Sequence, residues 1–139
     1  MPVFPRIPLV QRPTPIVKRQ RLDELLSVDL WVKRDDMTGG AEAGNKVRKL
    51  EFLLGDAMAS GCDTVITCGG LQSNHARATA LACASLGLAC VLVLRADDPS
   101  QKDLPRTGNL FLDRLAGAEL RLVSHEDYAK RAFVMDGIA

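Results

Sequence analysis

The chain has 139 residues, the length of one ordinary domain, and 47% of them are hydrophobic, enough for a core. Its 18 basic residues nearly balance its 17 acidic ones, and only 4% of the residues are aromatic. This composition excludes a protein whose main task is to hold nucleic acid. The uncharged run 78–94 is shorter than the roughly 20 residues that span a bilayer, so no membrane segment is expected.

The sequence predicts a cytoplasmic protein. Its proline-rich N-terminus has no apolar stretch of signal-peptide length. The four cysteines form no C-x-x-C pair, and we expect them to be small buried hydrophobic side chains in a reducing compartment.

The first 22 residues carry most of the prolines and five basic residues but no acidic one. Because proline fixes φ and removes a hydrogen-bond donor, this segment is predicted to be an extended arm laid over the domain surface. A short helix is predicted at 22–26, ending at Ser27. The alternation from Val28 to Lys33 then predicts a half-buried strand, and the glycine-rich loop that follows predicts no regular element.

From residue 45 onward, predicted helices and strands alternate. Apolar side chains recur at helical spacing from Asn45 to Gly61. Three further helices are expected, at 74–86, 107–117 and 124–139. Short apolar runs predict three strands, at 64–68, 90–94 and 119–123. This order predicts an α/β fold with an open, mostly parallel sheet in a three-layer arrangement, incomplete at the C-terminus because the chain stops within its last helix.

Lys46 directly follows a glycine-broken loop, at the start of a predicted helix. The positive end of the helix dipole, together with Arg48 and Lys49, disfavours an ammonium ion at this position. Such an environment suits a lysine that forms a Schiff base, because only the neutral amine attacks a carbonyl group. A solvated basic helix face is the alternative interpretation.

The segment CGGLQSNH, residues 68–75, joins a buried strand to the next helix. Its glycines permit a close approach of the backbone, and Ser73 and Asn74 lie beside the free N–H groups of the helix start. Since ligands of parallel sheets bind at the carboxyl ends of strands, the segment predicts a seat for a carboxylate or phosphate. Alternatively, Ser73 is only an N-cap and the glycines form only a turn. His75 is either an acid or base of the site or an exposed first-turn histidine.

Two carboxylates, Asp35 and Asp36, lie in the loop before Lys46. A hard-cation site needs more oxygen ligands than this loop offers. We therefore expect the pair to fix the loop, and no metal site is predicted.

Several stretches resemble the D-cysteine desulfhydrase/1-aminocyclopropane-1-carboxylate deaminase family: LWVKRDDMTG, GNKVRKLEFL, DTVITCGGLQSNHARATA and TGNLFLDRLAGAELRLVSHEDYAK. The resemblance runs from about Pro13 to Lys130 and implies a pyridoxal-phosphate-dependent enzyme with the fold of the tryptophan synthase β chain. It implies that residues 1–45 belong to the cofactor domain and that 46–139 form a small α/β domain, truncated at its end. Family members are more than twice as long, so a homodimer is expected only of a full-length protein. The remainder would supply the phosphate cup and the partner of the pyridine nitrogen.

The resemblance also implies roles for five residues. Lys46 matches the lysine that binds the cofactor covalently and moves protons, and Lys49 matches a residue near the cofactor phosphate. Ser73 matches the serine that holds the substrate carboxylate and is discussed as a nucleophile in the deaminases. Asn74 matches a contact to the cofactor's 3′ oxygen, and both Asn74 and His75 are expected to face the substrate, a small amino acid.

His75 and the RAT sequence after it resemble the desulfhydrase branch, because the deaminases more often have glutamine at the histidine position. This favours β-elimination from D-cysteine, in which the Cα proton passes to Lys46 and the thiolate leaves Cβ, giving pyruvate, ammonia and hydrogen sulfide. A 1-aminocyclopropane-1-carboxylate deaminase and a cysteate sulfo-lyase are the alternatives within the family. A non-catalytic α/β module that binds a small anion at residues 69–74 is the alternative of another class.

Overall fold

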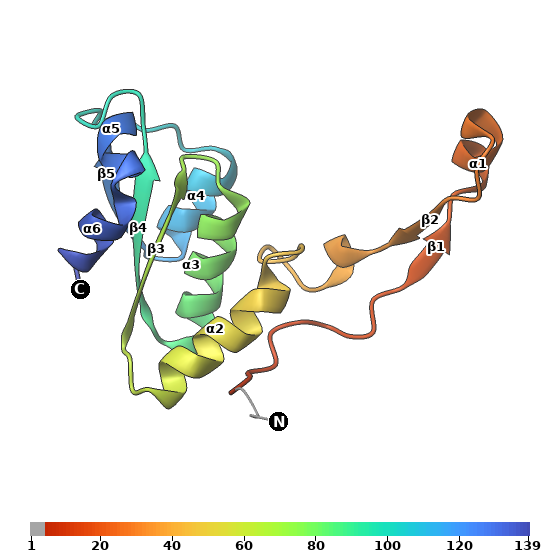
Figure 1. Ribbon diagram of the computed structural model, residues 1–139, viewed down its shortest axis with the longest axis horizontal. Helices are drawn as coiled ribbons and strands as arrows, with labels where there is room; N and C mark the ends of the chain where they lie inside the picture. Colours follow the sequence, from red (N-terminus) through yellow and green to blue (C-terminus); the bar gives the residue numbers. More distant parts are fainter. Residues whose placement is uncertain (1–4) are drawn as a thin grey trace.

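The computed structural model describes residues 5–139, which form an α/β body and a narrow projecting arm (Figure 1). The arm consists of strand β1 (Ile16–Lys18), helix α1 (Gln20–Leu26) and strand β2 (Trp31–Lys33). No helix within residues 5–139 has both the length and the apolar character needed to cross a membrane.

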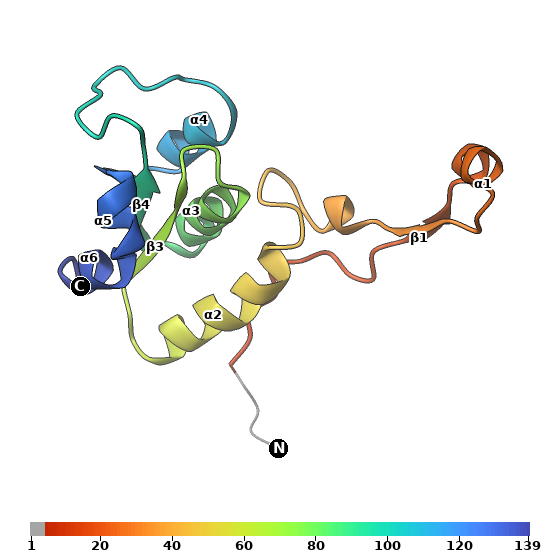
Figure 2. The ribbon, with the colours of Figure 1, turned by 45° about the horizontal axis from the view of Figure 1, so that its top comes forward.

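The body is built on three parallel strands in the order β3-β4-β5. Helix α3 covers one face of this sheet, with α2 and α4 beside it, while α5 and α6 lie on the opposite face (Figures 1 and 2). The strands are β3 (Thr64–Gly70), β4 (Ala89–Arg95) and β5 (Glu119–Val123). The helices are α2 (Val47–Ala59), α3 (Asn74–Leu86), α4 (Gly108–Leu115), α5 (His125–Ala129) and α6 (Arg131–Asp136). The predicted three-layer α/β fold is confirmed.

The core lies where α3 packs on β4. Leu92 and Leu94 of the central strand are fully buried. Helix α3 carries four alanines whose small side chains allow close packing against the elements around it, and these are at most 2% exposed: Ala76, Ala78, Ala80 and Ala82. In contrast, most of β3 is only half-buried, because it lies at the edge of the sheet.

The N-terminal segment follows the surface prediction for only part of its length. Near its start, the Ile7 amide donates to the Glu51 carbonyl oxygen on α2 at 3.0 Å, so this portion does lie over the body. Beyond it the prediction was wrong, because residues 16–18 form a strand that pairs antiparallel with β2 and extends away from the body. The backbone N–H and C=O groups of an isolated extended segment would bind only water. In this two-stranded ribbon they hydrogen-bond to each other instead.

Five other predictions need correction. The first helix begins at Gln20, and the strand predicted from Val28 begins only at Trp31. A short 3-10 helix, Asp35–Met37, occupies part of the loop predicted to be irregular. The last helix is two short ones, separated at Lys130. Only two of the four cysteines are buried as predicted, Cys83 and Cys90, whereas Cys62 is exposed and Cys68 is half-buried. A thiol on an edge strand or after a helix end stays accessible to solvent whatever its hydrophobicity.

Candidate functional site

Lys46 lies at the N-cap position of α2, where its carbonyl oxygen accepts from the amides of Lys49 and Leu50, each at 3.2 Å. Its half-buried side chain lines a cleft of about 540 Å³. Asn74, from the first turn of α3, lines the same cleft. The structure therefore brings together two of the five residues singled out in the sequence, from segments 28 positions apart.

The loop that precedes Lys46 is organised by Thr38, a residue that the sequence analysis missed. Thr38 is fully buried, and its hydroxyl donates to the Asp35 carbonyl oxygen at 2.8 Å. The Thr38 Oγ1 atom also accepts from the Gly44 amide at 2.9 Å, and the Thr38 carbonyl oxygen accepts from the Gln11 amide. One hydroxyl thus closes the loop on itself. No local pattern marks it, because a threonine in a polar loop is unremarkable until its neighbours are known.

Both loop carboxylates are bound to arginines. Arg48 Nη2 donates to Asp35 Oδ1 at 2.8 Å, and Arg34 Nε donates to Asp36 Oδ1 at 2.7 Å. Each hydrogen-bonded guanidinium lowers the pKa of its carboxyl below the ordinary value. The prediction that this pair fixes the loop is confirmed.

Ser73 is the N-cap of α3, and its Oγ accepts a hydrogen bond from the Ala76 amide at 3.2 Å. The glycine at the end of β3 makes room for it, because a Cβ on Gly69 would lie 2.6 Å from Ser73 Oγ. A side chain thus lies close to the backbone at Gly69, whereas Gly70 has open space around it, and close approach of a ligand stays a prediction. The capping interpretation of Ser73 is confirmed, and its role toward a carboxylate stays a prediction.

His75 is half-buried rather than an exposed histidine of the first turn. Its Nε2 lies 3.1 Å from Thr67 Oγ1, and its buried Nδ1 meets no hydrogen-bonding partner within residues 5–139. Burial lowers the pKa of His75, and the charges of Lys49 and Lys46 lower it further. The imidazole is therefore neutral near pH 7 and lies within electrostatic reach of both lysines.

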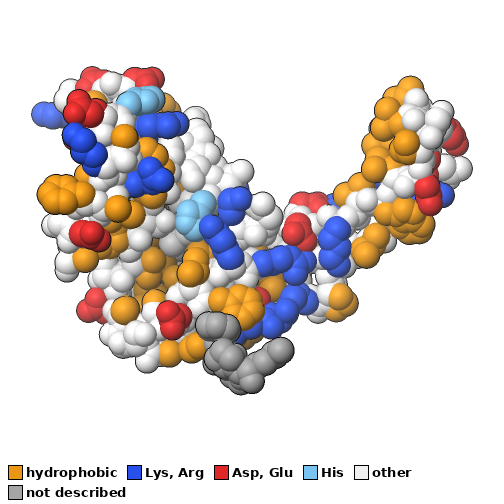
Figure 3. Space-filling view, in the orientation of Figure 1, with side chains coloured by type: hydrophobic (Ala, Val, Ile, Leu, Met, Phe, Trp, Pro, Cys, Tyr) orange, Lys and Arg blue, Asp and Glu red, His pale blue; other side chains and the backbone are white. Residues whose placement is uncertain are grey.

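Arg77 is a cleft residue that the sequence analysis did not identify. It follows Asn74 by one turn of α3, lines the cleft, and donates through Nη2 to the Ala43 carbonyl oxygen at 2.9 Å. This bond ties the loop that leads to Lys46 to the helix that carries Asn74. In the space-filling view, basic side chains gather where α2 meets the arm (Figure 3).

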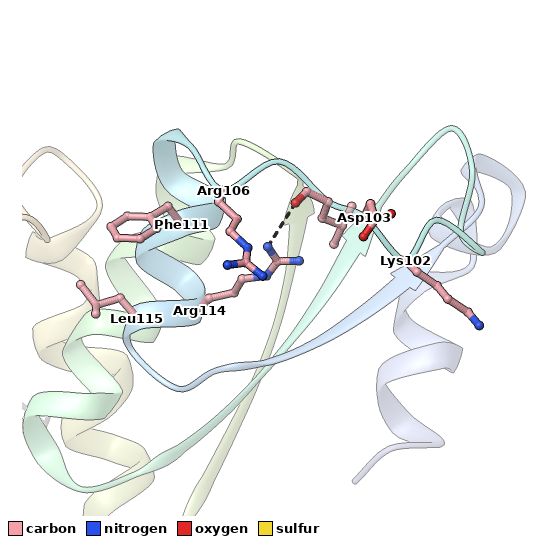
Figure 4. Close-up of a pocket in the computed structure, with 7 residues that line it drawn as sticks. Lys102, Asp103, Arg106, Phe111, Arg114 and Leu115 are labelled. Carbon is pink, nitrogen blue, oxygen red and sulfur yellow. Dashed lines mark hydrogen bonds between the residues drawn. The ribbon is translucent and has the colours of Figure 1, made fainter.

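A second cavity, of about 330 Å³, lies along α4 and the loop before it (Figure 4). Arg106 and Arg114 lie side by side there, and Arg114 Nη1 donates to the Leu104 carbonyl oxygen at 3.2 Å. None of the residues predicted to be functional lines this cavity. Of the residues predicted to be functional, Lys46 and Asn74 line the larger cleft instead.

Residues 7–136 match the family described as pyridoxal-phosphate dependent enzymes. The chain belongs to this family. A Pyrococcus abyssi protein provisionally named a 1-aminocyclopropane-1-carboxylate deaminase is 53% identical over 119 residues, which are 86% of this chain and 34% of that protein. A 1-aminocyclopropane-1-carboxylate deaminase from Burkholderia cenocepacia is 48% identical over 128 residues, 87% of this chain and 37% of its own.

A crystal structure of a 1-aminocyclopropane-1-carboxylate deaminase homologue superimposes with a TM-score of 0.78 at 44% identity, covering 86% of this chain and 35% of that one. The chain thus spans little more than a third of the length of these relatives. The fold predicted from the family resemblance is confirmed. The relatives carry the deaminase name, so they do not single out the desulfhydrase branch.

Proposed function

We propose that this chain forms the lysine-bearing part of a pyridoxal-phosphate-dependent lyase that acts on a small amino acid. The observation that carries the proposal is the cleft shared by Lys46 and Asn74. It combines a primary amine, which can bond an aldehyde, with an amide, which can donate to a ring oxygen. The loop that carries Lys46 is tied to α2 by the hydrogen bond from Arg48 to Asp35 and to α3 by the one from Arg77 to Ala43, which supports a preorganised cofactor site.

The residues present fit the cofactor. Lys46 would hold its aldehyde carbon through Nζ, and Asn74 would donate to its 3′ oxygen. The loop acids Asp35 and Asp36 line the same cleft, but each is paired with an arginine, so they oppose an anionic ligand less than free carboxylates would. When bound, pyridoxal phosphate supplies an electron sink that stabilises charge at the carbon next to the substrate amino group.

The protein side chains would handle binding and protons. Lys46 Nζ would accept the Cα proton, and the N-terminus of α3, with Ser73 as its cap, would receive the substrate carboxylate. His75 would face the substrate as a neutral imidazole, because burial and two nearby lysines lower its pKa. Lys49, exposed on the first turn of α2, would approach the cofactor phosphate.

Two substrates are in competition. We propose D-cysteine, supported by the resemblance of His75 and the residues after it to the desulfhydrase branch. 1-Aminocyclopropane-1-carboxylate is the second candidate, supported by the names of the relatives. The products separate them, since D-cysteine gives pyruvate, ammonia and hydrogen sulfide, whereas the cyclopropane substrate gives a four-carbon 2-oxo acid and ammonia. The kcat/KM is measured for both substrates. Release of sulfide from D-cysteine with the higher kcat/KM of the two supports D-cysteine as the substrate.

The larger assignments also remain proposals. We propose that residues 1–45 join the cofactor domain, that the full-length protein is a homodimer, and that it works in the cytoplasm. The exposed apolar side chains of the arm support the first of these, because they form no core of their own.

Covalent labelling tests the proposed function directly. The natural protein that carries this sequence is incubated with pyridoxal phosphate, reduced with borohydride and digested, and the modified peptide is identified by mass spectrometry. We expect the label on Lys46 and its loss in Lys46→Ala. Lys102→Ala, at the second cavity, is the matched control and should label normally. A label that stays on another lysine of the wild-type protein, with Lys46 unmodified, would overturn the assignment.

A further inference from the structure

The first residues of α4 hold the segment that carries Asn74. The Asn109 amide donates to Gln72 Oε1 and Asn109 Nδ2 donates to the Gln72 carbonyl oxygen, both at 2.8 Å. Gln72 Nε2 donates in return to the Thr107 carbonyl oxygen at 3.4 Å. Gly108 has a φ of +60°, and a Cβ there would lie 2.4 Å from Gln72 Oε1. Glycine is therefore needed for this contact between two distant segments.

Two donors orient the Asn74 amide, and Asn109 makes the shorter contact, since Arg77 Nη1 donates to Asn74 Oδ1 only at 3.5 Å. Asn109 Nδ2 donates to Asn74 Oδ1 at 2.9 Å. Because Oδ1 is the acceptor in this contact, the Asn74 NH2 group is the end left to face a ligand in the cleft. No residue of the described chain accepts a hydrogen bond from it.

The orientation of Asn109 is set in turn by an arginine. Arg77 Nη1 donates to Asn109 Oδ1 at 3.3 Å. A guanidinium can only donate, so the Asn109 oxygen must face Arg77 and its NH2 group must face Asn74. Since Arg77 also donates to the Ala43 carbonyl oxygen, the same arginine connects this relay to the loop of Lys46.

We propose that Asn109 is a positioning residue that fixes which end of the Asn74 amide faces the cofactor. The inference rests on the proposed function, in which Asn74 contacts the 3′ oxygen of pyridoxal phosphate. An NH2 group stabilises that oxygen as an anion, whereas a flipped amide would present its own oxygen and disfavour the anion. Asn109 does not line the cleft, so it acts through Asn74.

The decisive variant is Asn109→Asp, which keeps the size of the side chain and its contact with Arg77 but removes the NH2 group. In the cofactor-loaded natural protein, we expect the pH at which the visible absorbance band of the cofactor changes to rise by about one unit. Asn74→Ala should raise it similarly. In the double variant the two effects should not add, because both remove one interaction. If Asn109→Asp shifts the midpoint equally with and without Asn74, the proposal is overturned.

Two further measurements separate this inference from the proposed function. Asn109→Ala removes the donor without adding charge, and it should shift the midpoint in the same direction. In the cofactor-free protein, the side-chain amide NMR signals of Asn74 should move in both Asn109 variants, and thermal melts identify any variant that fails to fold. Unmoved Asn74 signals in a folded variant would refute the positioning role even if no cofactor binds. Failure to bind cofactor with moved signals would refute only the proposed function.

Discussion

Asp113, on α4, is fully buried, and neither of its carboxylate oxygens has a hydrogen-bond partner in the part of the chain that the structure describes. Burial raises its pKa to about 6, and the charge of Arg77 offsets this only in part. Because the unfolded carboxyl ionises near its ordinary value of 3.8, the unfolded chain releases this proton first as the pH rises. The folded state therefore loses stability between these two pKa values and stays less stable above them.

We expect Asp113→Asn to stabilise the protein at pH 7 and above, by about 1–3 kcal/mol, since the amide never ionises. The gain in stability should shrink as the pH falls from 6 and vanish below about 4, where the Asp113 carboxyl of the wild-type protein is protonated in both the folded and the unfolded chain. Urea titrations at pH 4.0, 5.5 and 7.5 would measure it. Asp136→Asn, at an exposed carboxyl, is the control and should show no such gain. A gain independent of pH would contradict the ionisation argument.

At the scale of elements, one glutamate attaches the N-terminal segment to α2. Glu51 is 2% exposed; its Oε1 accepts from the amides of Leu9 and Val10, each at 3.1 Å, and its Oε2 accepts from Arg6. Gly55, one turn later, allows the contact, because a Cβ there would lie 2.8 Å from the Pro5 carbonyl oxygen.

Glu51→Ala should cost about 1–3 kcal/mol of the free energy of unfolding, because it leaves two backbone donors without their acceptor. The clearest measurement is hydrogen exchange, in which the amides of Leu9 and Val10 should lose protection while those of β4 keep it. Glu126→Ala, at an exposed ion pair of α5, is the control and should change neither. Unchanged protection at Leu9 and Val10 in Glu51→Ala would show that the segment is held by other contacts.

At the scale of the whole molecule, the arm is distinct from the body. It exposes large apolar side chains, among them Leu25 at 76% and Ile16 at 60%, which no element of the described chain covers. Surfaces of this kind mark contacts with other protein. Trp31, the only tryptophan of the chain, lies on β2 and is 55% exposed, so its fluorescence reports on the arm alone.

We expect acrylamide to quench Trp31 in the folded 139-residue chain almost as strongly as in urea. Leu25→Glu should leave the melting temperature of the body unchanged, because Leu25 contributes nothing to the core. Leu92→Ala, which opens a cavity in β4, should lower the free energy of unfolding by about 2–5 kcal/mol. Strong protection of Trp31 from acrylamide would show instead that the arm folds against the body or against a second copy.

The sequence by itself determined the elements of the body and the residues of interest. Helical and strand periods are local signals, and they place α3 and the three strands of the body within two residues of their observed bounds, although the last helix was wrong. The family resemblance followed from motifs that are continuous in the chain, and the match of residues 7–136 to the family confirmed it.

Only the tertiary structure decided which residues share the cleft and what holds them. Asn109 contacts Asn74 across 35 positions, and Arg6 contacts Glu51 across 45. Such pairs leave no period or spacing in a single sequence, because folding alone brings them within hydrogen-bonding distance. The projecting arm escaped prediction likewise: proline content shows that a segment is extended, but pairing of β1 with β2 depends on a partner strand elsewhere in the chain.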